Sequence, residues 1–235
     1  HTARTQLGIL RSLLSRAADT DFGRRHAFTR LASLPDEQIL SAYRAEVAPG
    51  DWYSIKDLVA RMREGGEPNV LWPERVDNFA QTSGTTSGDK YIPVSKAMLK
   101  SNYRASLDIF CHMQRAGISL PDLTEGKSLF LGGTTQLSEN SHGVRTGDLS
   151  GIVVPLIRWP ISAIYLPGKE VALMSDWPAK IEAMARQCVR EDVRMMSGVP
   201  SWAGVLCDRV IELKREQDPR ARTLKDVWPN FTVFV

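Results

Sequence analysis

Apolar side chains in the first third of the chain recur every three or four residues, which predicts amphipathic helices. The expected helices cover residues 2–18, 36–47 and 54–64. Pro35 suits the first turn of the second helix, while Ser54 is placed to cap the third and Gly65 to end it. We therefore expect a helical scaffold over residues 1–76.

After residue 76 short apolar runs of strand length alternate with longer amphipathic segments. The expected strands lie at residues 78–80, 127–131, 193–196 and 231–235, and the expected helices at residues 95–116, 175–190 and 201–217. This alternation predicts a largely parallel sheet with right-handed crossover helices. The fold class expected for the chain is α/β, with residues 77–235 as a nucleotide-binding region.

One segment between these elements has almost nothing to bury. Gln81–Pro93 follows the strand end at Asn78–Ala80 and precedes Ser95, which is placed to cap the next helix. Its hydroxyl side chains are Thr82, Ser83, Thr85, Thr86 and Ser87. Packing cannot hold such a segment, so its polar groups need polar partners. A strand, a loop and a helix are expected in that order.

Phosphate suits this composition. Gly84 and Gly88 adopt positive φ without strain, so successive N–H groups can converge on an anion. Lys90 adds a positive charge, and a charge-assisted hydrogen bond contributes about 1.5–3 kcal/mol. We predict that residues Thr82 to Lys90 bind phosphate, the alternative being a solvated turn.

A second glycine pair, Gly132-Gly133, follows the expected strand at residues 127–131. Open α/β sheets bind ligands beyond the carboxyl ends of their strands, which is where this pair falls. It is either part of a ligand site or an ordinary tight turn. On the helix at residues 95–116, Lys96, Lys100 and Arg104 form a basic stripe, which we interpret as a solvated face, the alternative being a phosphate-binding surface.

Composition argues against several functions. The chain has 30 basic and 27 acidic residues and a net charge of +3, so no nucleic-acid partner is expected. Its longest apolar stretch, Gly151–Leu166, is interrupted by Pro155, Arg158 and Pro160, so no membrane partner is expected either.

The cysteines and histidines show no metal-ligand spacing, so no protein-bound metal site is expected. The cysteines are Cys111, Cys188 and Cys207. Each lies among apolar neighbours in an expected helix, which predicts buried, reduced thiols and a cytoplasmic location.

The glycine-rich and hydroxyl-rich segment resembles the phosphate loop of the adenylate-forming superfamily, the acyl-CoA synthetases and luciferases. The matching residues are Thr82, Ser83, Gly84, Thr85, Thr86, Gly88 and Lys90. With its continuation into Tyr91-Ile92-Pro93, it is most similar to the auxin-responsive Gretchen Hagen family, the acyl acid amido synthetases, in its bacterial branch. Five further segments are similar to that family in the same order, at residues 20–28, 53–62, 69–73, 197–202 and 228–235.

The resemblance implies an ATP-dependent acid-amide ligase. Such an enzyme activates a small carboxylic acid as an acyl adenylate and transfers the acyl group to an amine or amino acid. ATP and Mg²⁺ are implied, with Mg²⁺ bridging phosphate oxygens. Thr85 and Thr86 would hold the β and γ phosphates, and Lys90 would stabilise the leaving pyrophosphate, so Thr85 and Lys90 are the implied catalytic residues.

Related enzymes line the acyl pocket from the helix after the phosphate loop and from loops at strand ends. The matching candidates here are Tyr103, Leu107, Val199 and Trp202, with core packing as the alternative for each.

The resemblance covers part of the large N-terminal domain of an adenylate-forming enzyme. Two family motifs do not occur in these residues, a Tyr-x-x-Ser-Glu run and a Tyr-Arg-x-Gly-Asp run with the ribose-binding acid. The nucleotide-binding region is therefore expected to be incomplete at its C-terminus, and this piece is expected to be inactive alone. Two alternatives stay open: an acid-CoA or acyl-protein ligase of the same superfamily, and a non-catalytic nucleotide-binding homologue, which Asp89 beside the phosphate path would suit.

Overall fold

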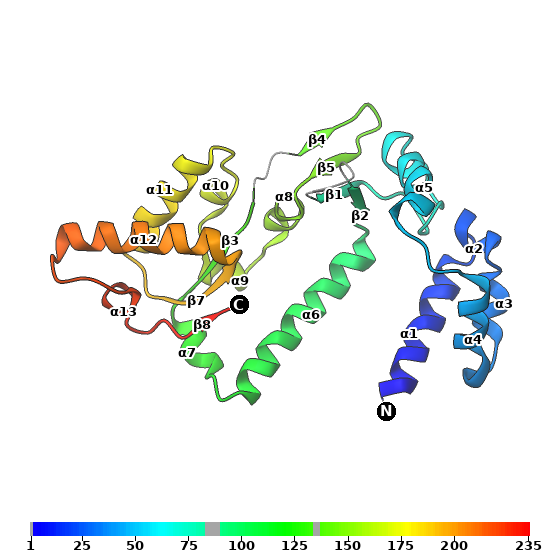
Figure 1. Cartoon of the computed structure of the whole chain (residues 1–235), viewed down its shortest axis with the longest axis horizontal. Helices are drawn as coiled ribbons and strands as arrows, with labels where there is room; N and C mark the ends of the chain where they lie inside the picture. Colours follow the sequence, from blue (N-terminus) through cyan, green and yellow to red (C-terminus); the bar gives the residue numbers. More distant parts are fainter. Residues whose placement is uncertain (1, 83–89, 134–136) are drawn as a thin grey trace. The chain divides into compact units, whose positions relative to one another are not determined.

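The computed structural model describes residues 2–82, 90–133 and 137–235. The chain divides into two compact units (Figure 1). The first contains residues 1–98 and 138–146, and the second contains residues 99–137 and 147–235. The first unit thus includes a hairpin and a later pair of strands as well as the expected helical scaffold.

The first unit begins with five helices. They are α1 (Thr2–Ala17), α2 (Asp21–Arg25), α3 (Phe28–Ser33), α4 (Asp36–Glu46) and α5 (Trp52–Glu64). The amphipathic face of α1 packs against α3 and α4 around Leu14, Leu31 and Ile39, each at most 2% exposed. The expected helices at residues 2–18 and 36–47 are confirmed to within one residue at each end.

Helix α5 begins two residues before the expected position. Asp51, not Ser54, is its N-cap, because the Asp51 carboxylate accepts a hydrogen bond from the Ser54 backbone N–H. The prediction of Ser54 as the cap was wrong. Both residue types cap helices, and the apolar periodicity extends back to Trp52, so the sequence did not distinguish them.

The two capping candidates can be separated by substitution. Asp51→Ala is expected to weaken the first turn of α5 by about 1 kcal/mol, because it removes the acceptor for an otherwise unpaired N–H. Ser54→Ala removes only a hydroxyl that donates to the Asp51 carbonyl, so a smaller effect is expected. Amide hydrogen exchange over residues 52–58 measures both effects, and equal protection in the two variants would contradict the assignment.

Sheet A of the first unit contains two antiparallel strand pairs. Its strands are β1 (Asn78–Thr82), β2 (Lys90–Pro93), β4 (Ser138–Glu139) and β5 (Arg145–Gly147), in the order β2-β1-β5-β4. The antiparallel pairs are β1 with β2 and β4 with β5. Phe79, which is fully buried, packs with Val59 and Met62 of α5. The hydrophobic face of α5 therefore fixes the hairpin of β1 and β2.

The second unit contains the parallel sheet. Its elements are α6 (Lys96–Arg115, which begins in the first unit), α7 (Leu120–Glu125), β3 (Lys127–Leu131), α8 (Leu149–Val153), a 3-10 turn (Val154–Leu156), α9 (Ile161–Ile164), β6 (Tyr165–Leu166), α10 (Lys169–Ala172), α11 (Trp177–Cys188), β7 (Val193–Gly198), α12 (Pro200–Gln217), α13 (Leu224–Val227) and β8 (Val233–Phe234). Sheet B has the strand order β6-β3-β7-β8, and every pair in it is parallel.

Helices cover both faces of sheet B (Figure 1). Leu129 and Met196 pack under α11 and α12, whereas Phe130 and Met195 pack against α7 and the end of α6. Alternate residues of a strand face opposite sides, so neighbouring residues contribute to separate cores. The expected α/β fold with a parallel sheet and crossover helices is confirmed.

The thiols differ in their surroundings. Cys188 is fully buried in the core under α11, where burial raises the pKa of its thiol to about 12. Cys207 is partly buried and Cys111 is exposed. Burial of all three cysteines was expected and is wrong for Cys111, which is exposed although Met113 on the same helix packs into the core with α7.

Candidate functional site

The predicted phosphate loop connects two paired strands. Thr82 ends β1 and Lys90 begins β2, and the two residues are directly opposite each other in the antiparallel register. Side chains of opposite residues lie on the same face of a hairpin. The structure therefore brings together the first and last of the predicted phosphate-binding residues. Ser83, Gly84, Thr85, Thr86 and Gly88 lie outside the described residues, so their assignment stays a prediction.

The strand that carries Lys90 is anchored next to it. Tyr91 points to the opposite face, where the Arg63 guanidinium of α5 lies 3.7 Å from the centre of its ring. The Val94 N–H donates to the Asn78 carbonyl at 2.8 Å, which closes the far end of the hairpin. Lys90 is half-buried beside this anchored residue, so its backbone position is defined by the fold.

The expected order of strand, loop and helix needs a correction. Lys90–Pro93 forms a strand before the helix, so the loop joins two strands. Tyr91 and Ile92 are good strand formers, and Pro93 is tolerated because β2 is an edge strand. Ser95 nevertheless caps the following helix as expected, since its Oγ accepts a hydrogen bond from the Met98 N–H at 3.1 Å.

A second candidate site lies at the carboxyl edge of sheet B. Leu131 at the end of β3 and Gly198 at the end of β7 are register partners. Gly132-Gly133 follows Leu131, and Val199 follows Gly198. The segments after β3 and β7 therefore start side by side at the carboxyl edge of sheet B. The expected position of the glycine pair beyond the end of a parallel strand is confirmed, and ligand binding there stays a prediction.

Lys180 of α11 reaches this edge and was not singled out from the sequence. It is 2% exposed, and its ammonium donates to the carbonyls of Gly132, Gly133 and Ala172. Burial lowers the pKa of Lys180, and the nearby carboxylate of Asp148 partly offsets this effect. The sequence did contain an indication of its burial, because Lys180 lies one turn before Met184 on the apolar face of the helix.

None of the four predicted acyl-pocket residues is a buried core residue. Tyr103, Leu107, Val199 and Trp202 are 55%, 44%, 47% and 37% exposed. Val199 and Trp202 lie in the same turn at the start of α12, where the Trp202 N–H donates to the Val199 carbonyl at 3.0 Å. The Trp202 ring contacts that of Trp177, with centroids 4.7 Å apart. The core alternative is therefore wrong, and the pocket assignment stays a prediction.

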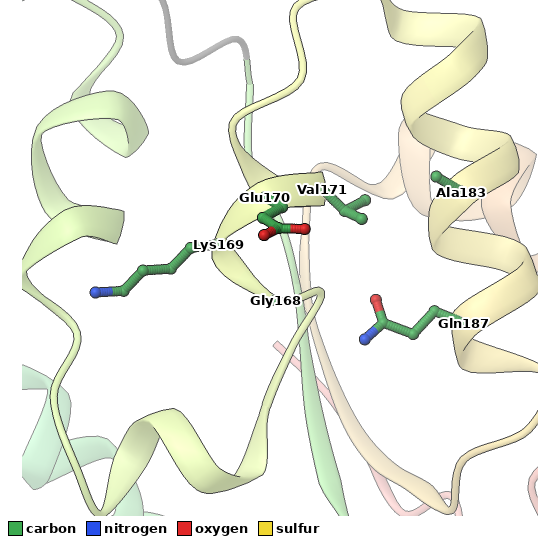
Figure 2. Close-up of a pocket in the computed structure, with 6 residues that line it drawn as sticks. All are labelled: Gly168, Lys169, Glu170, Val171, Ala183 and Gln187. Atoms are coloured by element: carbon green, nitrogen blue, oxygen red, sulfur yellow. The ribbon is translucent and has the colours of Figure 1, made fainter.

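A separate cavity of about 510 Å³ lies between α10 and α11. Its lining includes Val171, Ala183 and Gln187, and Figure 2 shows Ala183 and Gln187 pointing from α11 towards α10. The Gln187 Oε1 atom is buried without a hydrogen-bond partner. None of the sequence-predicted site residues lines this cavity.

In the part of the chain that the structure describes, no group of three or more His, Cys, Asp or Glu side chains is arranged to hold a metal ion. No described helix is long and apolar enough to cross a membrane.

The chain has an α/β fold, with parallel sheet B in the second unit and helices and a β-hairpin in the first. Residues 1–160 match the model of the GH3 family N-terminal domain. The chain belongs to this family, which confirms the predicted relationship.

Individual relatives agree with this assignment. Over 97 residues the chain is 31% identical to the probable indole-3-acetic acid-amido synthetase GH3.7 of Oryza sativa subsp. japonica, covering 40% of this chain and 15% of the rice protein. The structure of GH3.15 acyl acid amido synthetase matches 98% of this chain and 48% of its own, with a TM-score of 0.69 and 16% identity. The structure of AtGH3.15 acyl acid amido synthetase in complex with 2,4-DB matches with a TM-score of 0.64 and 18% identity, over 98% and 47% of the chains. The chain thus spans about half the length of these solved structures.

Proposed function

We propose that this chain is the N-terminal part of an ATP-dependent acid-amide ligase, which activates a carboxylic acid as an acyl adenylate and transfers the acyl group to an amine or amino acid. The observation that carries the proposal is the GH3 family match over residues 1–160, because this range includes the whole predicted phosphate loop. The amido synthetase names of the rice relative and of the solved structures support the same reaction class.

The first half-reaction brings two anions together. The carboxylate attacks the α-phosphate of ATP, and pyrophosphate leaves. Two unit charges 4 Å apart repel by about 4 kcal/mol at an effective dielectric of 20, so cations and oriented N–H groups must offset this. In the proposal, Lys90 supplies the charge and the loop between Thr82 and Lys90 supplies the donors. Thr82 and Lys90 share one face of the hairpin, which supports a common ligand for them.

Mg²⁺ would neutralise part of the phosphate charge when bound. Among the described residues no ligand cluster of the usual protein types is present. Mg²⁺ commonly binds to substrate phosphates and keeps several water ligands, so the proposal requires few or no protein ligands for it. The chain's own part is then to position the phosphate groups.

The second half-reaction transfers the acyl group directly to the attacking amine, so it needs no protein thiol. Burial raises the pKa of Cys188 to about 12 and that of Cys207 to about 11, so both thiols stay protonated near neutral pH. These two cysteines are therefore poor acyl carriers.

Pyrophosphate exchange tests the proposal. The full-length protein is incubated with ATP, Mg²⁺ and labelled pyrophosphate in the presence of a panel of carboxylic acids, and amino acids or CoA are then added. Acid-dependent exchange followed by amide formation is expected. Exchange with thioester formation would instead indicate an acid-CoA ligase, and ATP binding without exchange for any acid would indicate a non-catalytic homologue.

A further inference from the structure

Lys180 links three segments of the second unit under the carboxyl edge of sheet B. Its Nζ lies 2.7 Å from the Gly133 carbonyl, 2.9 Å from the Ala172 carbonyl and 3.3 Å from the Gly132 carbonyl. Three donors meet three acceptors, so the buried ammonium is fully hydrogen-bonded. The lysine thereby ties the turn after β3 to α10 and to α11.

Lysine is an unusual residue at a buried position. Removing an ammonium from water is costly, and here three carbonyl hydrogen bonds offset that cost. The ammonium does something an apolar side chain cannot do, because it fixes the orientation of two successive peptide groups. Gly132 and Gly133 have no side chains of their own to hold them, so Lys180 defines the conformation of this turn.

The space around the turn is also narrow. A Cβ on Gly133 would lie 2.7 Å from Asp148 Oδ2, and one on Gly132 would lie 3.0 Å from the Ser150 Cβ. The turn is therefore packed closely against the residues that begin α8. A small displacement of the turn would alter this contact.

The turn borders an apolar surface. Val199 and Trp202 follow the neighbouring strand β7 and are exposed, and Trp202 contacts Trp177 in the first turn of α11, the helix that carries Lys180. Exposed aromatic and aliphatic side chains beside a bare glycine backbone suit the apolar body of an organic acid better than a triphosphate.

We propose that Lys180 is a positioning residue that holds the Gly132–Gly133 turn in place as one wall of the site for the apolar body of the carboxylic acid substrate. The inference rests on the proposed function and adds a residue that acts on the acid through the turn, without contact between Lys180 and the substrate. The ATP phosphates are assigned to the hairpin loop, so the two substrates should respond differently to a change at Lys180.

Lys180→Met tests the inference in the full-length protein, because it keeps an unbranched stem and removes the three hydrogen bonds. In pyrophosphate exchange, KM for the acid is expected to rise about tenfold, while KM for ATP changes by less than about twofold, since a small misplacement of a binding wall has effects of this size or larger. The matched control is Lys127→Met. Lys127 also donates to a backbone carbonyl, that of Ala163, but lies at the amino end of β3.

A second variant reaches the same turn without changing the buried charge. Gly133→Ala places a methyl group 2.7 Å from Asp148 Oδ2, so the contact between the turn and Asp148 must change, and the same selective rise in KM for the acid is expected. Gly204→Ala is its control, because a Cβ there has nothing within 4 Å. If Lys180→Met does not fold, Gly133→Ala decides the question.

The outcomes separate the inference from the function it rests on. Equal increases in both KM values, or an unchanged KM for the acid in a folded variant, would overturn the role of Lys180 while leaving the ligase proposal in place. Absence of acid-dependent exchange in the unmodified protein would overturn both.

Discussion

Replacing Lys90 by alanine is expected to lower the rate of acid-dependent pyrophosphate exchange by about 100- to 1,000-fold in the full-length protein. This is the range observed when one preorganised group that stabilises developing charge is removed. Lys90 begins β2 directly opposite Thr82, and its neighbour Tyr91 is held by Arg63, so the backbone should stay in place in the variant. Thr85→Ala removes one neutral donor, so a smaller loss of about tenfold is expected.

Lys100 provides the matched control for Lys90. It lies on the exposed basic stripe of α6 with Lys96 and Arg104, and all three residues are solvent-exposed. Lys100→Ala is expected to leave exchange unchanged if this stripe is a solvated face. Equal losses in both variants would indicate a general effect of positive charge, and full exchange activity in Lys90→Ala would exclude the hairpin loop as the phosphate site.

The strands and helices with a buried face could be predicted from the sequence. Lys127–Leu131 was expected as a strand and is β3 with the same bounds, because it is a short apolar run bounded by glycines. The helix opened by Asp176 was also expected, and its carboxylate accepts a hydrogen bond from the Ala179 N–H at 2.7 Å. Burial leaves a local pattern in both elements, and capping leaves a second one at the start of α11.

Features that depend on distant partners could not be predicted in the same way. Lys90–Pro93 is a strand because β1 offers it a pairing edge, which no local pattern records. The apolar positions of α6 predict an amphipathic helix, but they do not say what covers it, and Tyr103 and Leu107 are in fact exposed. Lys180 is a polar residue on a buried face, and its role follows only from the three carbonyls that meet its ammonium.

Truncating Trp228 to alanine is expected to destabilise the second unit by about 3–5 kcal/mol, the range for removing a buried tryptophan. Trp228 is fully buried against α11 and α12, and its Nε1–H donates to the Cys188 carbonyl at 2.9 Å. Trp228→Phe keeps most of the ring volume and removes the donor, so a smaller loss of about 1–3 kcal/mol is expected. Native-state amide hydrogen exchange of β3 and β7 measures these losses without assuming that both units unfold together.

Trp159 is the matched control for Trp228, because the same residue type is 82% exposed in the same unit. Trp159→Ala is expected to change the stability of the unit by less than about 0.5 kcal/mol, as is usual for exposed positions. Trp228 follows α13, beyond the residues matched by the family model, yet it packs on both helices that cover one face of the parallel sheet. If β3 and β7 exchange as slowly in Trp228→Ala as in the unmodified protein, residues 224–228 do not complete this core, and α11 and α12 stabilise this face of the sheet without them.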